Sequence, residues 1–226
     1  MCISVKAPTF PLFRRPDSVR HKTKENCILD IPLLQDADKT QFPKLTEDDL
    51  GEIRIRQARA GDVHGMSALI NHYAANNVML ARGPQYLFQH LQDYIVATST
   101  HRRTGQELVV GCAALHVLWR DLAEVRSLAV HTACHHQGLG SRIVRELIVR
   151  CRNLDIPRLF CFTLVDSFFS ACGFTVFNRE LLPPMVWTEC SKCPKFYHCD
   201  EISMIYEVDQ EFNERKTGDR PETEAH

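Results

Sequence analysis

Two glycines one residue apart stand where a helix is expected to begin, in the stretch GLGSRIVRELIVRC. Gly138 and Gly140 follow an apolar, strand-like segment and a polar loop. Glycine lets a phosphate approach the main chain closely, and the first turn of a helix offers unpaired N–H groups at the positive end of its dipole. The pattern therefore indicates an anion site. A plain strand-to-helix joint shows the same pattern, and Walker A is excluded because no Gly-Lys-Ser/Thr follows.

Three clustered cysteines form a second group that could do chemistry. Cys190, Cys193 and Cys199 have the spacing C-x2-C-x5-C, which suits zinc, although a structural zinc site needs a fourth ligand. The candidates for that ligand are His198, Asp200 and Cys172, and none is compelled. Three reduced thiols without a metal explain the cluster equally well, so zinc stays open and no metal ligand is assigned.

Length, net charge and hydropathy exclude several classes of protein. The chain has 226 residues, enough for one domain of ordinary size plus tails, and a formal net charge of −1. Such a charge gives no electrostatic reason to expect binding to nucleic acid or to an anionic membrane. No apolar run approaches the roughly 18–20 residues that span a bilayer, and no secretory signal is recognisable. We therefore expect a cytoplasmic protein whose ten cysteines are mostly reduced thiols.

The order of elements predicts an α/β domain with a mostly antiparallel first half. Period-two alternation and apolar runs predict strands, and apolar stripes at helical spacing predict helices. We expect strands at 53–58, 94–99, 107–118, 123–130, 158–164 and 201–208, and helices at 62–77, after Pro84, at 139–152 and at 167–172.

The two ends of the chain differ in composition from this middle part. Residues 1–52 mix prolines with basic residues, and the first 24 contain one acid, Asp17, against six Lys and Arg. This favours an upstream extension with little order, with an organelle transit peptide as the alternative. Residues 209–226 are polar and are expected to fray. The folded domain is predicted to cover 53–208.

The segment SLAVHTACHHQGLGSRIV resembles the acetyl-CoA-binding segment of the GNAT acyltransferase superfamily. That pattern is Gln/Arg-x-x-Gly-x-Gly/Ala after a strand ending in Leu-x-Val. Gly138 and Gly140 match its last two fixed positions, whereas His135 stands where Gln or Arg is usual. The resemblance implies a GNAT-like fold, with a central mixed, mostly antiparallel sheet that is splayed near 123–130 and flanked by helices. It also implies that acetyl-CoA contacts Leu128, Ala129, Val130, His135, His136, Gln137, Gly138, Leu139, Gly140 and Ser141.

The same resemblance suggests the groups that catalyse acetyl transfer. Glu124 matches the position of the general-base glutamate in several members of the superfamily, and on a strand it shares a face with Arg126. The alternative is an exposed Glu–Arg pair worth well under ~1 kcal/mol. The usual general acid is a tyrosine, but Phe169 stands at that position. Water, Ser170 or Cys172 would have to supply the proton instead.

A longer resemblance concerns the acceptor of the acetyl group. Stretches from 53 to 208, among them LINHYAANNVMLARGPQYLFQHLQDYIVA and LLPPMVWTECSKCPKFYHCDEISM, resemble the short bacterial N-acetylglutamate synthases. This implies that acetyl-CoA acetylates the α-amine of L-glutamate, at the entry to arginine biosynthesis. The two carboxylates of glutamate call for cationic partners, for which Arg82 and Arg126 are the candidates. An acetyltransferase of another small amine or a peptide, a non-enzymatic acetyl-CoA-binding module and a homo-oligomer remain open.

Overall fold

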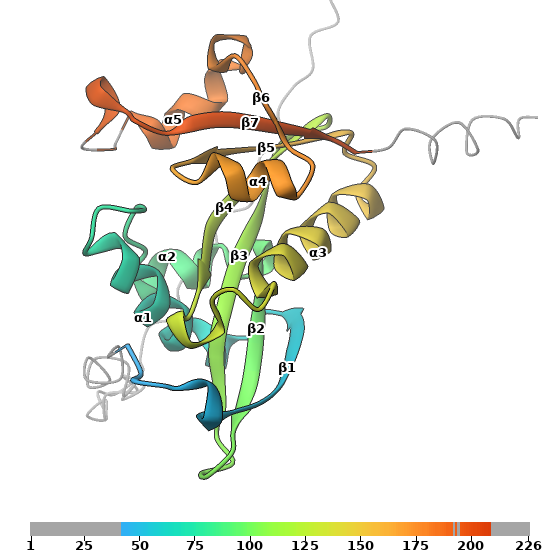
Figure 1. The fold of residues 1–226 in the computed structure, drawn as a ribbon. Coiled ribbons are helices and arrows are strands. Elements are labelled where there is room, and N and C mark those ends of the chain that lie inside the picture. The colour runs from blue at the N-terminus through green and yellow to red at the C-terminus, as the bar shows by residue number, and fades with distance from the viewer. Residues whose placement is uncertain (1–41, 192, 194, 209–226) are drawn as a thin grey trace, which may run out of the picture. The chain divides into compact units, whose positions relative to one another are not determined.

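A seven-stranded mixed sheet positions every candidate residue described below. The computed structural model describes residues 42–191, 193 and 195–208, and within these the strand order is β1-β2-β3-β4-β5-β7-β6 (Figure 1). The strands are β1 (Leu50–Gln57), β2 (Tyr94–His101), β3 (Glu107–Trp119), β4 (Leu122–Val130), β5 (Arg158–Thr163), β6 (Thr175–Val176) and β7 (Ile202–Glu207). The helices are α1 (Val63–Ala74), α2 (Pro84–Gln89), α3 (Leu139–Asn153), α4 (Asp166–Ala171) and α5 (Trp187–Cys190).

The sheet consists of two parts that meet between β4 and β5. β1 to β4 form an antiparallel meander, as the sequence predicts, and β5, β7 and β6 are antiparallel to one another. β4 and β5 are parallel and pair at two positions, Ala123 with Leu159 and Glu124 with Phe160. Beyond Glu124 the two strands separate (Figure 1). The expected mixed, splayed sheet is confirmed.

A bulge bends β4 just after this point of separation. Cys112 pairs with Ala129 and Ala114 pairs with Arg126. Between these two pairs, β4 therefore contains one more residue than β3. Ser127, inside the bulge, has a φ of 51°, which non-glycine residues seldom adopt. The bulge increases the local twist and turns the end of β4 away from β5.

Helices bury apolar stripes against both faces of the sheet. α3 packs one stripe into a core that it shares with α4, and its predicted members are all buried: Ile143, Val144, Leu147, Ile148 and Cys151. α1 and α2 cover the opposite face through Met66, Leu69 and Leu87. Trp187 of α5 packs against a third cluster that contains Leu122 of β4. Leu122 and Glu124 are two residues apart on β4, so their side chains point to the same face of the sheet. This third cluster therefore adjoins Glu124.

The start of α1 differs in detail from the sequence prediction. The helix spans Val63–Ala74 where 62–77 was predicted, and the carboxylate of Asp62 makes no hydrogen bond that caps it. That carboxylate accepts two hydrogen bonds from Arg56, at 2.7 and 2.9 Å, and one from the main-chain N–H of Arg59 at 2.7 Å. Asp62 therefore ties the end of β1 to the beginning of α1.

The described residues ahead of β1 pack against the domain. The ring of Phe42 stacks between His72 and His131, at centroid distances of 3.8 and 4.5 Å. Nε2 of His131 lies 2.9 Å from the carbonyl oxygen of Pro43. β1 itself starts at Leu50, ahead of the boundary predicted at residue 52.

Some predictions concern residues that the structure does not describe, and two short elements of the structure were not predicted. Of the extension or transit peptide predicted at 1–52, residues 1–41, with Cys2 and Cys27, lie outside the described residues, as does the tail at 209–226. The two-residue strand β6 and the short helix α5 were not predicted. Among the described helices, none has the length and apolar character needed to cross a membrane.

Candidate active site

The segment 131–140, here called the glycine loop, leads from the end of β4 into the first turn of α3. Gly138 is the residue before α3 and has a φ of 73°, in the left-handed region, and a Cβ added there would meet no heavy atom within 4 Å. A Cβ on Gly140 would instead lie 3.1 Å from the ring of Phe168. The two glycines therefore serve different purposes. Gly138 leaves open space beside the unpaired N–H groups of the helix start, and Gly140 permits close packing of α3 on α4.

The end of β4 is held by two side chains. The hydroxyl of Tyr73 donates to the carbonyl oxygen of Val130, and Nε2 of His135 lies 2.9 Å from that same oxygen and 2.9 Å from the Tyr73 hydroxyl. His135, the residue that departs from the family pattern, thus folds back onto the strand. On the far side of the loop, the amide of Gln137 donates to the carboxylate of Glu47.

Glu124 and Arg126 form a buried ion pair on the face of the sheet that α1 and α2 cover. Nε of Arg126 donates to Oε2 of Glu124 at 2.7 Å, and their side chains are 9% and 11% exposed, respectively. The alternative of an exposed surface pair is therefore wrong. Burial raises the pKa of Glu124 above that of an ordinary glutamate, although the positive charge of Arg126 opposes the shift. A buried carboxylate with a raised pKa is suited to accept a proton near neutral pH.

Arg82 joins the same region from the loop between α1 and α2. Its Nη1 donates to Glu189 of α5 at 3.0 Å, and its Cζ lies 4.1 Å from the centroid of the Tyr86 ring. Its main chain is fixed to α1, because Asn71 bonds both its N–H and its carbonyl, and Ser67 bonds the carbonyl as well. This anchoring explains why a loop residue is held inside the domain, with a side chain only 10% exposed.

One buried atom of Arg82 stands out within the described residues. Its Nε makes no hydrogen bond although it is buried. A buried N–H without an acceptor costs free energy comparable to a lost hydrogen bond, on the order of 1–3 kcal/mol. An oxygen of a bound ligand at this position would remove that cost. The positive charge of Arg82 also contributes to the electrostatics of Glu124, so the two groups lie in one region.

Sequence reasoning missed Glu189 and Tyr86, which shape this region around Arg82. Glu189 lies in α5, 107 residues from its partner, and no periodic pattern marks it.

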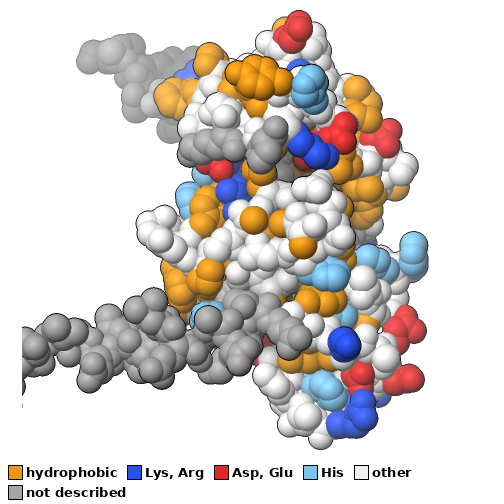
Figure 2. Space-filling view, turned by 90° about the vertical axis from the view of Figure 1, so that its left-hand side faces the viewer, with side chains coloured by type: hydrophobic (Ala, Val, Ile, Leu, Met, Phe, Trp, Pro, Cys, Tyr) orange, Lys and Arg blue, Asp and Glu red, His pale blue; other side chains and the backbone are white. Residues whose placement is uncertain are grey.

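Figure 2 shows one face of the molecule, on which most acidic and basic side chains lie toward the top and bottom and mainly hydrophobic or uncharged ones lie between.

The proton donor expected from a tyrosine has no counterpart at Phe169. Its ring is buried in the core, 5.1 Å from Phe168 and 5.2 Å from Phe174 between ring centroids. Of the two alternatives named from the sequence, Ser170 is exposed. Cys172 is half-buried, and its Sγ lies 3.7 Å from Oγ of Ser141 in the first turn of α3. Cys172 is therefore the donor candidate closer to the glycine loop.

The three clustered cysteines do not assemble a metal site among the described residues. Cys190, Cys193 and Cys199 are half-buried, but they do not form a group with three ligand atoms within 4.8 Å of one another. Burial raises the pKa of Cys190 to about 11, which keeps it a neutral thiol at pH 7. Sγ of Cys199 lies 3.8 Å from the carboxylate of Glu201.

Comparison with known proteins identifies a family whose sequence pattern this chain matches. Residues 67–175 match the Acetyltransferase (GNAT) family. An uncharacterized N-acetyltransferase of Chlorobaculum tepidum is 32% identical over 151 residues, which cover 67% of this chain and 94% of that relative. An amino-acid acetyltransferase of Mycobacterium tuberculosis is 38% identical over 121 residues, covering 54% of this chain and 67% of the relative.

Solved structures show the same fold. Rv2747 from M. tuberculosis, in complex with CoA and NLQ, has a TM-score of 0.57 and 30% identity, covering 69% of this chain and 99% of that one. N-acetylglutamate synthase from Neisseria gonorrhoeae, complexed with coenzyme A and N-acetyl-glutamate, has a TM-score of 0.61 and 24% identity. That alignment covers 70% of this chain and 36% of the synthase.

Proposed function

Because the chain belongs to the GNAT acetyltransferase family, we propose that it transfers the acetyl group of acetyl-CoA to the α-amine of L-glutamate. The observation that carries the choice of acceptor is the buried Arg82, whose Nε lacks a partner within the described residues, beside the buried pair of Glu124 and Arg126. The product, N-acetylglutamate, places the reaction at the entry to arginine biosynthesis. Relatives named amino-acid acetyltransferase support this assignment.

In the proposed mechanism, acetyl-CoA binds along the end of β4 and the glycine loop. The free N–H groups at Leu139, Gly140 and Ser141 bind the pyrophosphate, aided by the positive end of the α3 dipole. The open space at Gly138 lets the phosphates reach those groups. The separation of β4 from β5 leaves room at the strand end for the pantetheine arm.

Glu124 acts as the general base in this proposal. It removes a proton from the ammonium group of glutamate, and the resulting amine attacks the thioester carbonyl. The C–N bond forms to give a tetrahedral intermediate, and the C–S bond breaks as this intermediate collapses. The nitrogen releases its second proton to water, and the thiolate of CoA takes up a proton from water or from Cys172. The hydrogen bond from Arg126 holds the Glu124 carboxylate in position throughout.

The two arginines bind the carboxylates of glutamate in this arrangement. Arg82 offers its unpartnered Nε to one of them, while Nη1 stays bonded to Glu189. Arg126 is bonded to Glu124 through Nε, so its terminal amino groups are those that a second carboxylate would use. Two arginines and two glutamates make the unliganded site neutral overall, which limits the cost of burying the charges.

A panel of acceptors tests the proposal. Purified full-length protein is assayed for acetyl transfer from acetyl-CoA to L-glutamate, L-glutamine and L-lysine. Losing one charge-assisted contact costs about 1.5–3 kcal/mol, so we expect kcat/KM for glutamine to be roughly 10–150-fold below that for glutamate. Similar values for all three amines would defeat the glutamate assignment and leave a GNAT acetyltransferase of broader specificity. Acetyl-CoA binding without any turnover would support a binding module.

Arg82→Ala should reduce the preference for glutamate over glutamine by about tenfold or more, with little change in the KM for acetyl-CoA. Because this variant removes Arg82 from beside the half-buried carboxylate of Glu189, the double variant Arg82→Ala/Glu189→Ala separates specificity from misfolding. Arg54→Ala, which removes a side chain that is 74% exposed, is the control. An unchanged glutamate-to-glutamine ratio in both folded Arg82 variants would remove Arg82 from the acceptor site.

A further inference from the structure

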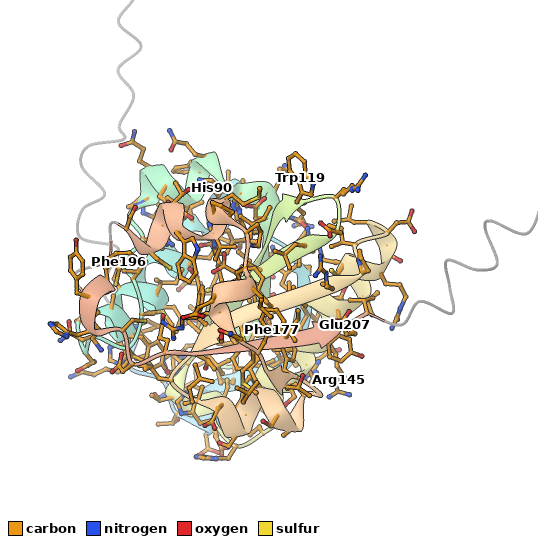
Figure 3. All side chains as sticks on the ribbon, turned by 90° about the horizontal axis from the view of Figure 1, so that it is seen from above. His90, Trp119, Arg145, Phe177, Phe196 and Glu207 are labelled. Atoms are coloured by element: carbon orange, nitrogen blue, oxygen red, sulfur yellow. The ribbon has the colours of Figure 1, made fainter. Side chains whose placement is uncertain are left out.

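Two histidines and an aspartate converge beside the proposed active site from two separate parts of the chain. His90, labelled in Figure 3, follows the last residue of α2, Asp93 lies one helical turn further along the chain, and His116 lies in β3. Nδ1 of His116 is 3.0 Å from Oδ2 of Asp93, and Nδ1 of His90 is 3.6 Å from the same oxygen. One ligand atom from each of the three residues lies within 4.8 Å of the other two.

These separations are close to those of a metal coordination shell. In a tetrahedral zinc site with metal–ligand bonds of about 2.0–2.1 Å, neighbouring ligand atoms are about 3.3 Å apart. Two of the three separations lie within about 0.3 Å of that value. His90 and Asp93 are three residues apart on a single turn, and His116 arrives from a distant strand. A short chelating pair joined by a remote third ligand is a common arrangement for zinc.

We propose that His90, Asp93 and His116 bind one divalent transition-metal ion of the zinc type, with water completing its coordination shell. Two imidazoles and one carboxylate suit zinc, cobalt or nickel, whereas magnesium and calcium prefer oxygen ligands alone. The three side chains are 34%, 30% and 24% exposed, so an ion can reach them from solvent and retain a water ligand.

The surroundings of the cluster are compatible with this role. The ring of Tyr86 packs against His90 at 4.3 Å between centroids, which restricts the orientation of that imidazole. Arg150 lies nearby, since its Nη2 bonds the carbonyl oxygen of Gln92 and its charge interacts with Asp93. This cation weakens the attraction for a metal, so we expect a site of moderate affinity. Because His116 pairs with Glu124 across β3 and β4, the ion would sit next to the proposed base.

Without a metal, the same contacts are one histidine–aspartate hydrogen bond, between His116 and Asp93 at 3.0 Å, and a longer contact between His90 and Asp93 at 3.6 Å. Titration of chelator-treated, full-length protein with Zn²⁺ in a calorimeter distinguishes the two cases. We expect one equivalent per chain in the wild type. In His90→Ala and in His116→Ala the affinity should fall by at least on the order of 10–100-fold, the loss caused even by removing an outer-shell partner. His136→Ala, an exposed histidine in the glycine loop, is the control.

Co²⁺ absorption separates this site from the cysteines. Coordination by nitrogen and oxygen gives visible d–d bands without the near-ultraviolet charge-transfer band of cobalt thiolates. We expect the spectrum to persist in the variant Cys190→Ser/Cys193→Ser/Cys199→Ser and to disappear in His116→Ala. A thiolate band that disappears with the cysteines, or Zn²⁺ binding that survives both histidine substitutions, would overturn the proposal. The measurements require no enzymatic activity, so their outcome is independent of the acceptor assignment.

Discussion

Glu124→Gln is expected to lower kcat on the order of 10²–10⁴-fold at neutral pH, the loss typical of removing a general base. Glutamine has nearly the same shape and can still accept the hydrogen bond from Nε of Arg126, which measures 2.7 Å in the native pair. The substitution should therefore leave the fold and acetyl-CoA binding intact. Steady-state kinetics and a calorimetric titration with acetyl-CoA measure the two effects separately.

The pH dependence of the reaction provides a second readout for Glu124. A base must be ionised to act, and burial raises the pKa of this carboxyl group. The rate should consequently fall, as the pH is lowered, at a higher pH than an exposed glutamate would give. This acidic limb should flatten in Glu124→Gln. Glu52→Gln, which changes a side chain that is 73% exposed, is the control. If Glu124→Gln retains most of the activity, Glu124 has a structural role only.

Gly138→Val is the second substitution with a large expected effect, in this case on acetyl-CoA binding. Valine disfavours a φ of 73°, and its methyl groups would occupy the open space before α3. Losing two charge-assisted hydrogen bonds to the pyrophosphate costs about 3–6 kcal/mol, which corresponds to roughly 10²–10⁴-fold in Kd. The chain offers a matched control in Gly105→Val, because Gly105 has a φ of 72° and equally open surroundings between β2 and β3.

Calorimetry and thermal unfolding of both glycine variants decide this prediction. The strain from the positive φ should lower the stability of the two variants to a similar extent, about 1–2 kcal/mol. Only Gly138→Val should lose affinity for acetyl-CoA. Equal affinities in the two variants would mean that Gly138 is a joint between strand and helix and makes no contribution to phosphate binding.

The elements with strong periodicity could be predicted from the sequence, and short ones could not. The apolar stripe of α3 and the alternation of β4 each specify one buried face, so their boundaries agree with the structure to within one or two residues. β6 has two residues and α5 has four, too few for a period to be recognised. Their positions depend on pairing with β7 and on the cluster around Trp187.

The candidate site was predictable only in part, for a related reason. Gly138 carries a local signal, because its backbone conformation is required wherever it stands in the fold. The burial of Glu124 depends on tertiary packing, including the neighbouring cluster that contains Trp187 of α5, which the strand pattern does not reveal. The bond from Arg82 to Glu189 and the approach of His116 to Asp93 join residues that are 107 and 23 apart. Such contacts are decided by tertiary packing, and neither has a spacing that a sequence reveals.

The narrow junction between β4 and β5 has a consequence for how the protein melts. Two ladder positions connect the halves of the sheet, and the two halves also share one buried core to which α3, β4 and β5 all contribute. Acetyl-CoA bound between the diverging strands would contact both of them and so stabilise the junction. At a hundredfold excess over its Kd, such a ligand adds about 2.7 kcal/mol to the free energy of unfolding. The cosubstrate would thus decide how cooperatively the two halves unfold on heating, and withdrawing it would loosen the junction first.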